Sequence, residues 1–244
     1  MLPDAITLRG EMASFLAVAL VLLLAVRPIA ALTGLDRSLV GDLFWGAGVA
    51  FVLAGHVAYL AVIAPASLID AFVLIRVQSG IEPLAGAAAS SAVWWWFARR
   101  RAAVRAWLAV ALVSGLVLAT VAYDGACVLR DACFGAPAPA PLGFPMAGLA
   151  DARIATPLVE AAVLLALLAA VVRVWRRLDA FTLAASIIGV LAVVRVAFMP
   201  LSVAGRDAVD ARTAITLAAG LAALAVTAWR ARTSHARARD PAAR

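Results

Sequence analysis

The sequence carries little charge and almost none of the residues from which metal sites are built. Charged residues make up 14% of the 244 positions, whereas soluble domains carry about 25%. Lysine is absent, so all 21 basic side chains are arginine, a usage that fits a high-GC bacterial coding bias. Two cysteines and two histidines, His56 and His235, are too few and too scattered for a zinc site. We therefore expect no metal and no cofactor, and the low charge excludes an ordinary soluble domain.

Apolar residues take the place of the missing charge. They make up 66% of the chain, and the mean hydropathy is +1.02. Crossing the hydrocarbon core takes about 20 apolar residues, and continuous apolar runs favour helices because a membrane barrel needs alternating polarity. The sequence therefore predicts an all-α integral membrane protein, with a single transmembrane domain over residues 1–244. Seven helices are expected, near residues 13–32, 43–64, 83–98, 104–122, 157–174, 180–199 and 213–229.

The arginines alternate between successive connections. Because basic residues are retained on the cytoplasmic side, the alternation predicts an outside N-terminus, an outer segment at 123–156 and a cytoplasmic tail at 230–244. Topology and anionic lipid explain the clusters, so nucleic-acid binding is not expected. We expect a multi-pass monomer in a bacterial inner membrane. The predicted inner clusters are Arg27 with Arg37, Arg99 to Arg101 with Arg105, Arg173 with Arg176 and Arg177, and the arginines of the tail.

The longest interruption in the apolar pattern runs from Tyr123 to Glu160. It contains three aspartates, two arginines and both cysteines, and polar groups between hydrophobic segments are costly unless they are paired or functional. Cys127 and Cys133 lie six residues apart. We expect two small buried thiols, because closing so short a loop in a partly helical segment is strained. A disulfide on an oxidising face is the alternative.

Ionisable residues within or at the edge of the apolar segments are candidates for a functional site, and the alternative for each is pairing with a neighbouring helix or a place at the interface. Arg195 lies deep in its segment, so we expect it to face the bundle interior and bind an acid, carbonyl groups or a lipid phosphate. Glu160 follows Thr156 and Pro157, which are typical of a helix N-cap and first turn, so its structural role would be dipole compensation. The other candidates are Glu11, His56 and Glu82.

Three segments match the motif order of one known family. Tyr123–Pro137, followed by Pro141-Leu142-Gly143, lies in register with a signature segment that begins Gly-Arg-(Ile/Leu)-Gly. Arg153–Glu160 matches Arg-His-Pro-(Ser/Thr)-Gln-Leu-Tyr-Glu and keeps four of its residues, and Val194–Met199 keeps the arginine of Phe-Arg-x-x-x-Glu. Over nearly its whole length the chain resembles the prolipoprotein diacylglyceryl transferases, seven-helix inner-membrane enzymes with an outside N-terminus.

Other motif positions carry different residues. Where the family has its signature arginine and an asparagine-like residue, this chain has Asp124 and Arg130. The family's His-Gly-Gly motif falls on Leu84-Ala85-Gly86. The family's first-helix tyrosine, second-helix arginine and the acid that pairs with the late arginine correspond to Glu11, His56 and Met199.

The resemblance implies transfer of a diacylglyceryl group from phosphatidylglycerol to the cysteine thiol of a lipoprotein signal peptide. Such a reaction needs cations to hold the phosphate and a base to form the thiolate. The substrate-binding candidates are Arg195, Arg153, Arg130 and Asp124, with Arg130 as the expected partner of Asp124. The candidate bases are Glu160, His56 and Glu11.

Two other function classes remain open at the level of sequence. One is a non-catalytic relative that binds a lipid or a partner protein. The other is a small-molecule transporter, which is disfavoured because no inverted repeat is found and seven helices do not divide evenly.

Overall fold

A computed structural model describes residues 3–63, 65, 81–127, 135–139, 141, 143, 145, 151–174, 179–198, 201, 218, 220–223 and 225–226, without the side chains of 3–12, 63, 83 and 174. These residues form helices and their connections, together with an isolated antiparallel bridge between Pro137 and Arg153. The helices are α1 (Pro3–Thr33), α2 (Arg37–Ile63), α4 (Pro83–Arg100), the 3₁₀ turn η3 (Ala102–Val104), α5 (Arg105–Gly125), α6 (Thr156–Val174) and α7 (Ala180–Phe198).

Acidic side chains cap the starts of three helices. Ser38 donates from both its backbone N–H and its hydroxyl to Asp36 Oδ1 at the start of α2, at 2.8 and 2.9 Å, and these hydrogen bonds hold the pKa of Asp36 below its ordinary value. Glu82 accepts from the backbone N–H of Leu84 at 3.2 Å at the start of α4. Asp179 accepts from the first backbone N–H groups of α7. Such caps satisfy donors that have no partner within the helix.

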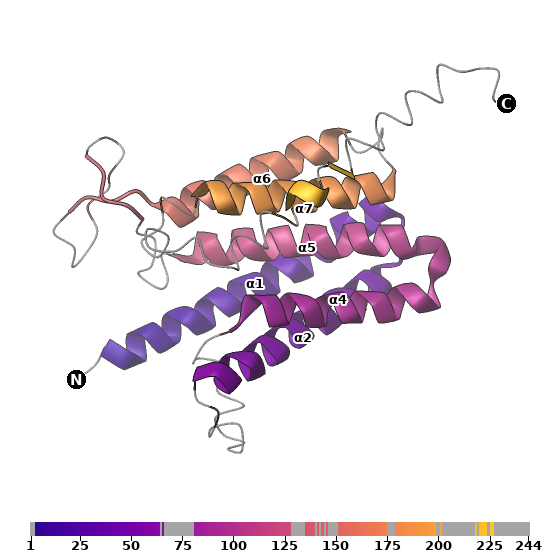
Figure 1. The fold of residues 1–244 in the computed structure, drawn as a ribbon, viewed down its shortest axis with the longest axis horizontal. Coiled ribbons are helices and arrows are strands. Elements are labelled where there is room, and N and C mark those ends of the chain that lie inside the picture. The colour runs from indigo at the N-terminus through magenta and orange to yellow at the C-terminus, as the bar shows by residue number, and fades with distance from the viewer. Residues whose placement is uncertain are drawn as a thin grey trace.

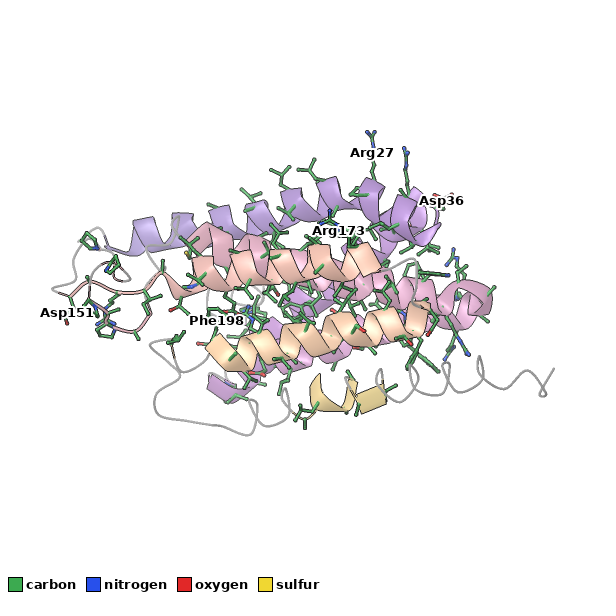
Figure 2. The ribbon with its side chains drawn as sticks, turned by 90° about the horizontal axis from the view of Figure 1, so that it is seen from above. Arg27, Asp36, Asp151, Arg173 and Phe198 are labelled. Atoms are coloured by element: carbon green, nitrogen blue, oxygen red, sulfur yellow. The ribbon has the colours of Figure 1, made fainter. Side chains whose placement is uncertain are left out.

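The helices run side by side as a bundle (Figure 1). Helices α5, α6 and α7 pack against one another, α2 pairs with α4, and α1 packs mainly on α5. Seen from above, Asp151 and Phe198 lie toward one end of the molecule, and Arg27 and Asp36 lie toward the other (Figure 2). The end that carries Asp151 and Phe198 is called the triad end below, after the ion pairs found there.

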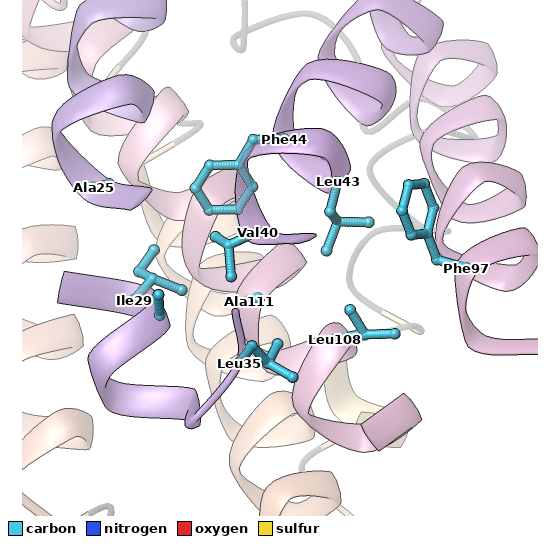
Figure 3. Close-up of a cluster of buried hydrophobic side chains, with 10 residues drawn as sticks. Ala25, Ile29, Leu35, Val40, Leu43, Phe44, Phe97, Leu108 and Ala111 are labelled. Carbon is cyan, nitrogen blue, oxygen red and sulfur yellow. The ribbon is translucent and has the colours of Figure 1, made fainter. Parts of the chain in front are cut away.

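Two apolar clusters hold the bundle together. One joins α1, α2, α4 and α5 around Val40, Leu43, Phe44 and Leu108 (Figure 3). The other joins α5, α6 and α7 around Leu164 and the buried face of α7. In lipid, helices associate through close packing more than through the hydrophobic effect, and small residues allow that closeness.

Glycine makes the closest approaches between helices. A Cβ at Gly86 of α4 would lie 2.8 Å from the backbone oxygen of Phe51 in α2. A Cβ at Gly115 of α5 would lie 2.7 Å from the ring of Phe44. The contacts of α2 with α4 and α5 therefore depend on the absence of a side chain at these positions.

Five helices are long and apolar enough to cross a membrane, which makes the chain a multi-pass, all-helical membrane protein. They cover Ala13–Thr33, Arg37–Val62, Ala102–Gly125, Thr156–Arg173 and Ala180–Phe198. Helix α4 forms where the sequence predicts it but is less hydropathic, because it holds three tryptophans, two serines and two arginines in 18 residues. Most of the predicted helix at 213–229 lies outside the described residues. Its described positions are helical, and Gly220 packs against Ala192 of α7.

Candidate functional site

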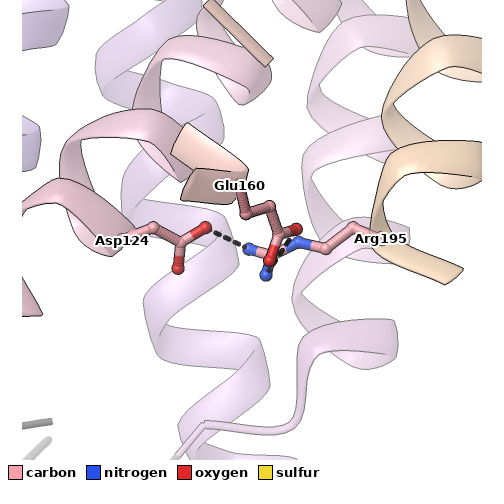
Figure 4. A network of polar contacts seen from close by, with 3 residues as sticks. All are labelled: Asp124, Glu160 and Arg195. Carbon is pink, nitrogen blue, oxygen red and sulfur yellow. Dashed lines mark ion pairs between the residues drawn. The ribbon is translucent and has the colours of Figure 1, made fainter. Parts of the chain in front are cut away.

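The triad end is built around Arg195, which forms ion pairs with two acids on two other helices. Its Nη2 lies 3.1 Å from Oδ2 of Asp124, and its Nη1 lies 3.1 Å from Oε1 of Glu160. The two carboxylates approach the guanidinium from different sides (Figure 4). We call Asp124, Glu160 and Arg195 the triad.

Each member of the triad lies near the end of its helix that faces the triad end of the bundle. Asp124 is the penultimate residue of α5, Glu160 is the fifth residue of α6, and Arg195 lies in the last turn of α7. Because α6 runs antiparallel to α5 and α7, the start of α6 meets the ends of the other two. The three helices therefore bring together residues that are 36 and 35 positions apart in the chain.

The two carboxylates of the triad are buried, so their pairing with Arg195 affects the stability of the fold. The side chains of Asp124 and Glu160 are 9% and 8% exposed, whereas that of Arg195 is 41% exposed. A buried charge costs several kcal/mol unless it is paired, so Arg195 is what permits two carboxylates between apolar helices. Two of the five N–H donors of a guanidinium suffice for two such contacts, and the exposed part of Arg195 remains accessible to a ligand.

A network of backbone hydrogen bonds closes the bundle beside the triad. The carbonyl oxygen of Leu201 accepts from the backbone N–H of Ala136 at 2.8 Å and from the Thr156 hydroxyl at 3.0 Å. Gly135 donates to the carbonyl of Ile154 at 2.7 Å, and a Cβ at Gly135 would overlap the Thr156 hydroxyl. The segment before α6 and the segment after α7 are thus joined.

Arg153 belongs to this network. Its Nη1 donates to the carbonyl oxygen of Gly135 at 3.1 Å. Its Nε is buried and donates to no acceptor among the described residues. A buried donor without an acceptor is unfavourable by about 1–3 kcal/mol, so this N–H is suited to a ligand oxygen.

The expectation of two unbridged thiols is wrong for Cys127. This residue is fully buried, one turn beyond Asp124, and is disulfide-bonded. The chain contains only one other cysteine, Cys133, which lies outside the described residues. Helix α5 ends at Gly125 and gives way to a short 3₁₀ turn at residues 126 and 127, so the backbone at Cys127 is not α-helical.

A narrow apolar groove runs between the same three helices, inward from the triad. It is shallow and partly open, with a cavity volume of about 10 Å³, which is room for roughly one water molecule. Leu164 in this lining lies one turn from Glu160, and the lining continues along α6 to Val171, a length of about 10 Å. The other lining residues are Val117, Leu168, Ile187 and Val190.

The structure brings together three of the seven residues that the sequence nominates. His56 is buried in α2, and Arg153 donates to the carbonyl oxygen of Gly135. Glu11 lies in α1, but its side chain is outside the described part, as is Arg130. Glu82 serves as the cap of α4. The described residues contain no group of three His, Cys, Asp or Glu side chains that could hold a metal ion.

The predicted helix end near Asp124 and the predicted partner of Asp124 were both wrong. Residues 123–125 were expected in the outer segment, but α5 continues through Gly125. The expected cation for Asp124 was Arg130, whereas in the structure it is Arg195. Arg195 thus has acidic partners although Met199 stands at the position expected for one. Comparison with models of known protein families finds no match, and comparison with curated proteins finds no similar sequence.

Proposed function

We propose that the chain binds a phospholipid at the triad end, as a divergent member of the prolipoprotein diacylglyceryl transferases. One observation carries the proposal: the charged triad and the apolar groove are formed by the same three helices, α5, α6 and α7. Only about 6 Å along α6 separates Glu160 from Leu164. A charged site next to an apolar groove fits a molecule with a charged headgroup and an acyl chain.

Arginine chemistry supports a phosphate headgroup at this end. The guanidinium of Arg195 is partly exposed, and it offers donors beyond those that face Asp124 and Glu160. The buried Nε of Arg153 supplies a further donor, which has no acceptor in the part of the chain that the structure describes. Phosphatidylglycerol, which the family resemblance nominates, carries such a phosphate and two acyl chains.

The proposal places the triad end outside the cytoplasm of a bacterium. The arginine-rich connections lie at the opposite end, as the positive-inside rule requires. The disulfide at Cys127 lies beside the triad, and disulfides persist in oxidising compartments. In this arrangement α4 and the segment at 213–229 complete a seven-helix topology with an outside N-terminus.

Transfer to a lipoprotein signal peptide would use the same site. The thiolate sulfur attacks the glyceryl carbon that carries the phosphate oxygen, so a C–S bond forms while the C–O bond breaks. Glycerol phosphate leaves with the electron pair, and Arg195 offsets its charge. The thiol proton goes to a carboxylate. Glu160 is the candidate because it matches the glutamate of the family motif, whereas Asp124 stands where the family has an arginine.

A second candidate is a relative that binds lipid without transferring it. The observation that favours it is the engagement of Arg195 by two carboxylates, since a phosphate must then compete with both. Asp124 also stands where the family has its signature arginine. Binding and transfer therefore need separate tests.

Complementation tests transfer. A bacterium depleted of its own transferase is supplied with this gene, and the signal-peptide cysteine of a lipoprotein is examined by mass spectrometry. A diacylglyceryl mass on that cysteine is the expected result for the enzyme. Normal membrane insertion without that mass, in a protein that still binds phosphatidylglycerol, assigns the second candidate.

Blocking the groove tests binding. Leu168→Trp fills the groove between α6 and α7, whereas Leu165→Trp adds the same ring to an exposed position one turn away. Native mass spectrometry of the detergent-purified protein should show phosphatidylglycerol adducts reduced at least tenfold by Leu168→Trp and unchanged by Leu165→Trp. Equal adduct levels in both variants and the parent protein would refute lipid binding in the groove.

A further inference from the structure

A cluster of four arginines lies at the end of the bundle opposite the triad. Arg99 and Arg100 end α4, and Arg101 and Arg105 flank η3. All four are exposed, and none forms an ion pair with a described residue. From Pro83 to Tyr123 the sequence contains no acidic residue, and the one carboxylate of α5, Asp124, lies at the triad end and pairs with Arg195.

Aromatic rings hold two of these arginines in place. The guanidinium of Arg100 lies 4.2 Å from the centre of the Trp96 ring, and that of Arg101 lies 5.6 Å from the centre of the Phe97 ring. Stacking on a ring occupies the face of a guanidinium and leaves the N–H donors at its edge available. The arginines are therefore oriented before any ligand binds.

Exposed tryptophans lie in α4 just before the stacked arginines and in the neighbouring helix α2. Trp95 and Trp96 are 57% and 46% exposed, and Trp45 of α2 is 75% exposed. The pairing of α2 with α4 fixes the relative heights of these tryptophans along the bundle axis, because the Ser90 hydroxyl of α4 donates to the carbonyl oxygen of Ala47 in α2 at 2.8 Å. Trp45 thus lies near the level of the α4 tryptophans. Tryptophan is enriched where the hydrocarbon meets the headgroups, so this arrangement marks the interface of one leaflet.

We propose that Arg99, Arg100, Arg101 and Arg105, together with Trp45, Trp95 and Trp96, form a binding site for anionic phospholipid headgroups of the leaflet at this end of the bundle. The arginines bind the phosphate, and the tryptophans lie against the upper acyl and glycerol region. Charge complementarity identifies the occupant, since four exposed cations that form no ion pair with a described residue fit an anionic lipid at headgroup level. The site is at the other end of the protein from the triad and does not depend on the proposed function.

The test compares lipid selectivity in two triple variants of the full chain. The first is Arg99→Gln with Arg100→Gln and Arg101→Gln. The second, with the same charge removed, is Arg27→Gln with Arg37→Gln and Arg173→Gln, which are exposed arginines outside the cluster. Each protein is purified and titrated with phosphatidylglycerol or phosphatidylcholine, and bound lipid is counted by native mass spectrometry.

The cluster variant should lose most of its preference for phosphatidylglycerol. Each arginine near an anionic surface contributes about fivefold, so three removed together lower the affinity ratio by roughly a hundredfold. The second triple variant should keep the ratio within about fivefold, and Arg100→Lys should retain charge but lose part of the preference. An equal loss in both triple variants, or no loss in the cluster variant, would overturn the site.

Discussion

Replacing Arg195 by methionine tests whether the triad stabilises the fold. The substitution keeps a long side chain but leaves the carboxylates of Asp124 and Glu160 without this cation in an apolar bundle. Removing one partner of a buried ion pair costs about 3–5 kcal/mol. The 41% exposure of the Arg195 side chain lets solvent reach the pair, so we expect the lower end, about 3 kcal/mol.

Reversible unfolding of the detergent-purified protein by added SDS measures this cost, with the fluorescence of its seven tryptophans as the signal. Arg195→Met combined with Asp124→Asn and Glu160→Gln should recover most of the lost stability, because no buried charge then remains in the triad. Arg173→Met, at an exposed arginine of α6, is the matched control and should change stability by less than about 0.5 kcal/mol. A loss below about 1 kcal/mol in Arg195→Met, or no recovery in the triple variant, would show that the triad does not stabilise the fold.

Three further outcomes follow from local geometry. Gly86→Ala should lower the free energy of unfolding by about 1–3 kcal/mol, because its Cβ would meet the α2 backbone. Gly48→Ala, whose Cβ would meet nothing within 4 Å, should be neutral or stabilising by up to about 1 kcal/mol. SDS unfolding compares the two variants, and equal losses would contradict the close approach at Gly86. Asp36→Ala should lower the unfolding midpoint at pH 6, and the effect should shrink as the pH falls below 3.8. The reason is that the folded-state pKa of Asp36 is depressed and its charged cap is lost on protonation. An effect independent of pH would argue against the charged cap. Cys127 should resist iodoacetamide until a reductant is added, as intact mass reports, and alkylation without reductant would contradict the disulfide.

Helix positions could be predicted from sequence because a long apolar run in lipid has one available structure. The predicted segments near 83–98, 157–174 and 180–199 correspond to α4, α6 and α7. The first two helices begin earlier than predicted, since polar residues such as Arg37 and Asp42 extend α2 beyond its apolar part. Hydropathy locates the part of a helix within lipid, whereas caps such as Asp36 locate its start.

The site was harder to predict than the helices. Arg195 and Glu160 stood out as ionisable residues in apolar segments, and both are in the triad. Asp124 was also nominated, but with Arg130 as its partner, because a cation six residues away is the nearest one in sequence. Which of several cations meets an acid depends on how α5, α6 and α7 face one another, and side-chain spacing along the chain does not contain that information.

The backbone network beside the triad has no sequence signature at all. Leu201 accepts from Ala136 and Thr156 through its carbonyl oxygen, and any residue offers such an oxygen. Gly135 was the one available signal, because only glycine fits against the Thr156 hydroxyl. The disulfide was missed for a related reason: the strain expected of a short loop depended on a helical backbone that ends two residues before Cys127.

The triad also sets an order for biogenesis. Synthesis proceeds from the N-terminus, so Asp124 and Glu160 enter the bilayer with α5 and α6 before α7, which carries Arg195, has left the ribosome. An isolated α7 would insert at a penalty for its arginine, and that penalty is offset once the two acids are already in place. A chain that stops before residue 180 lacks the ion pairs of Arg195 and leaves two carboxylates that α7 would have paired. Arrival of α7 is thus the step that commits the nascent chain to its assembled state and removes the feature that membrane quality control would recognise.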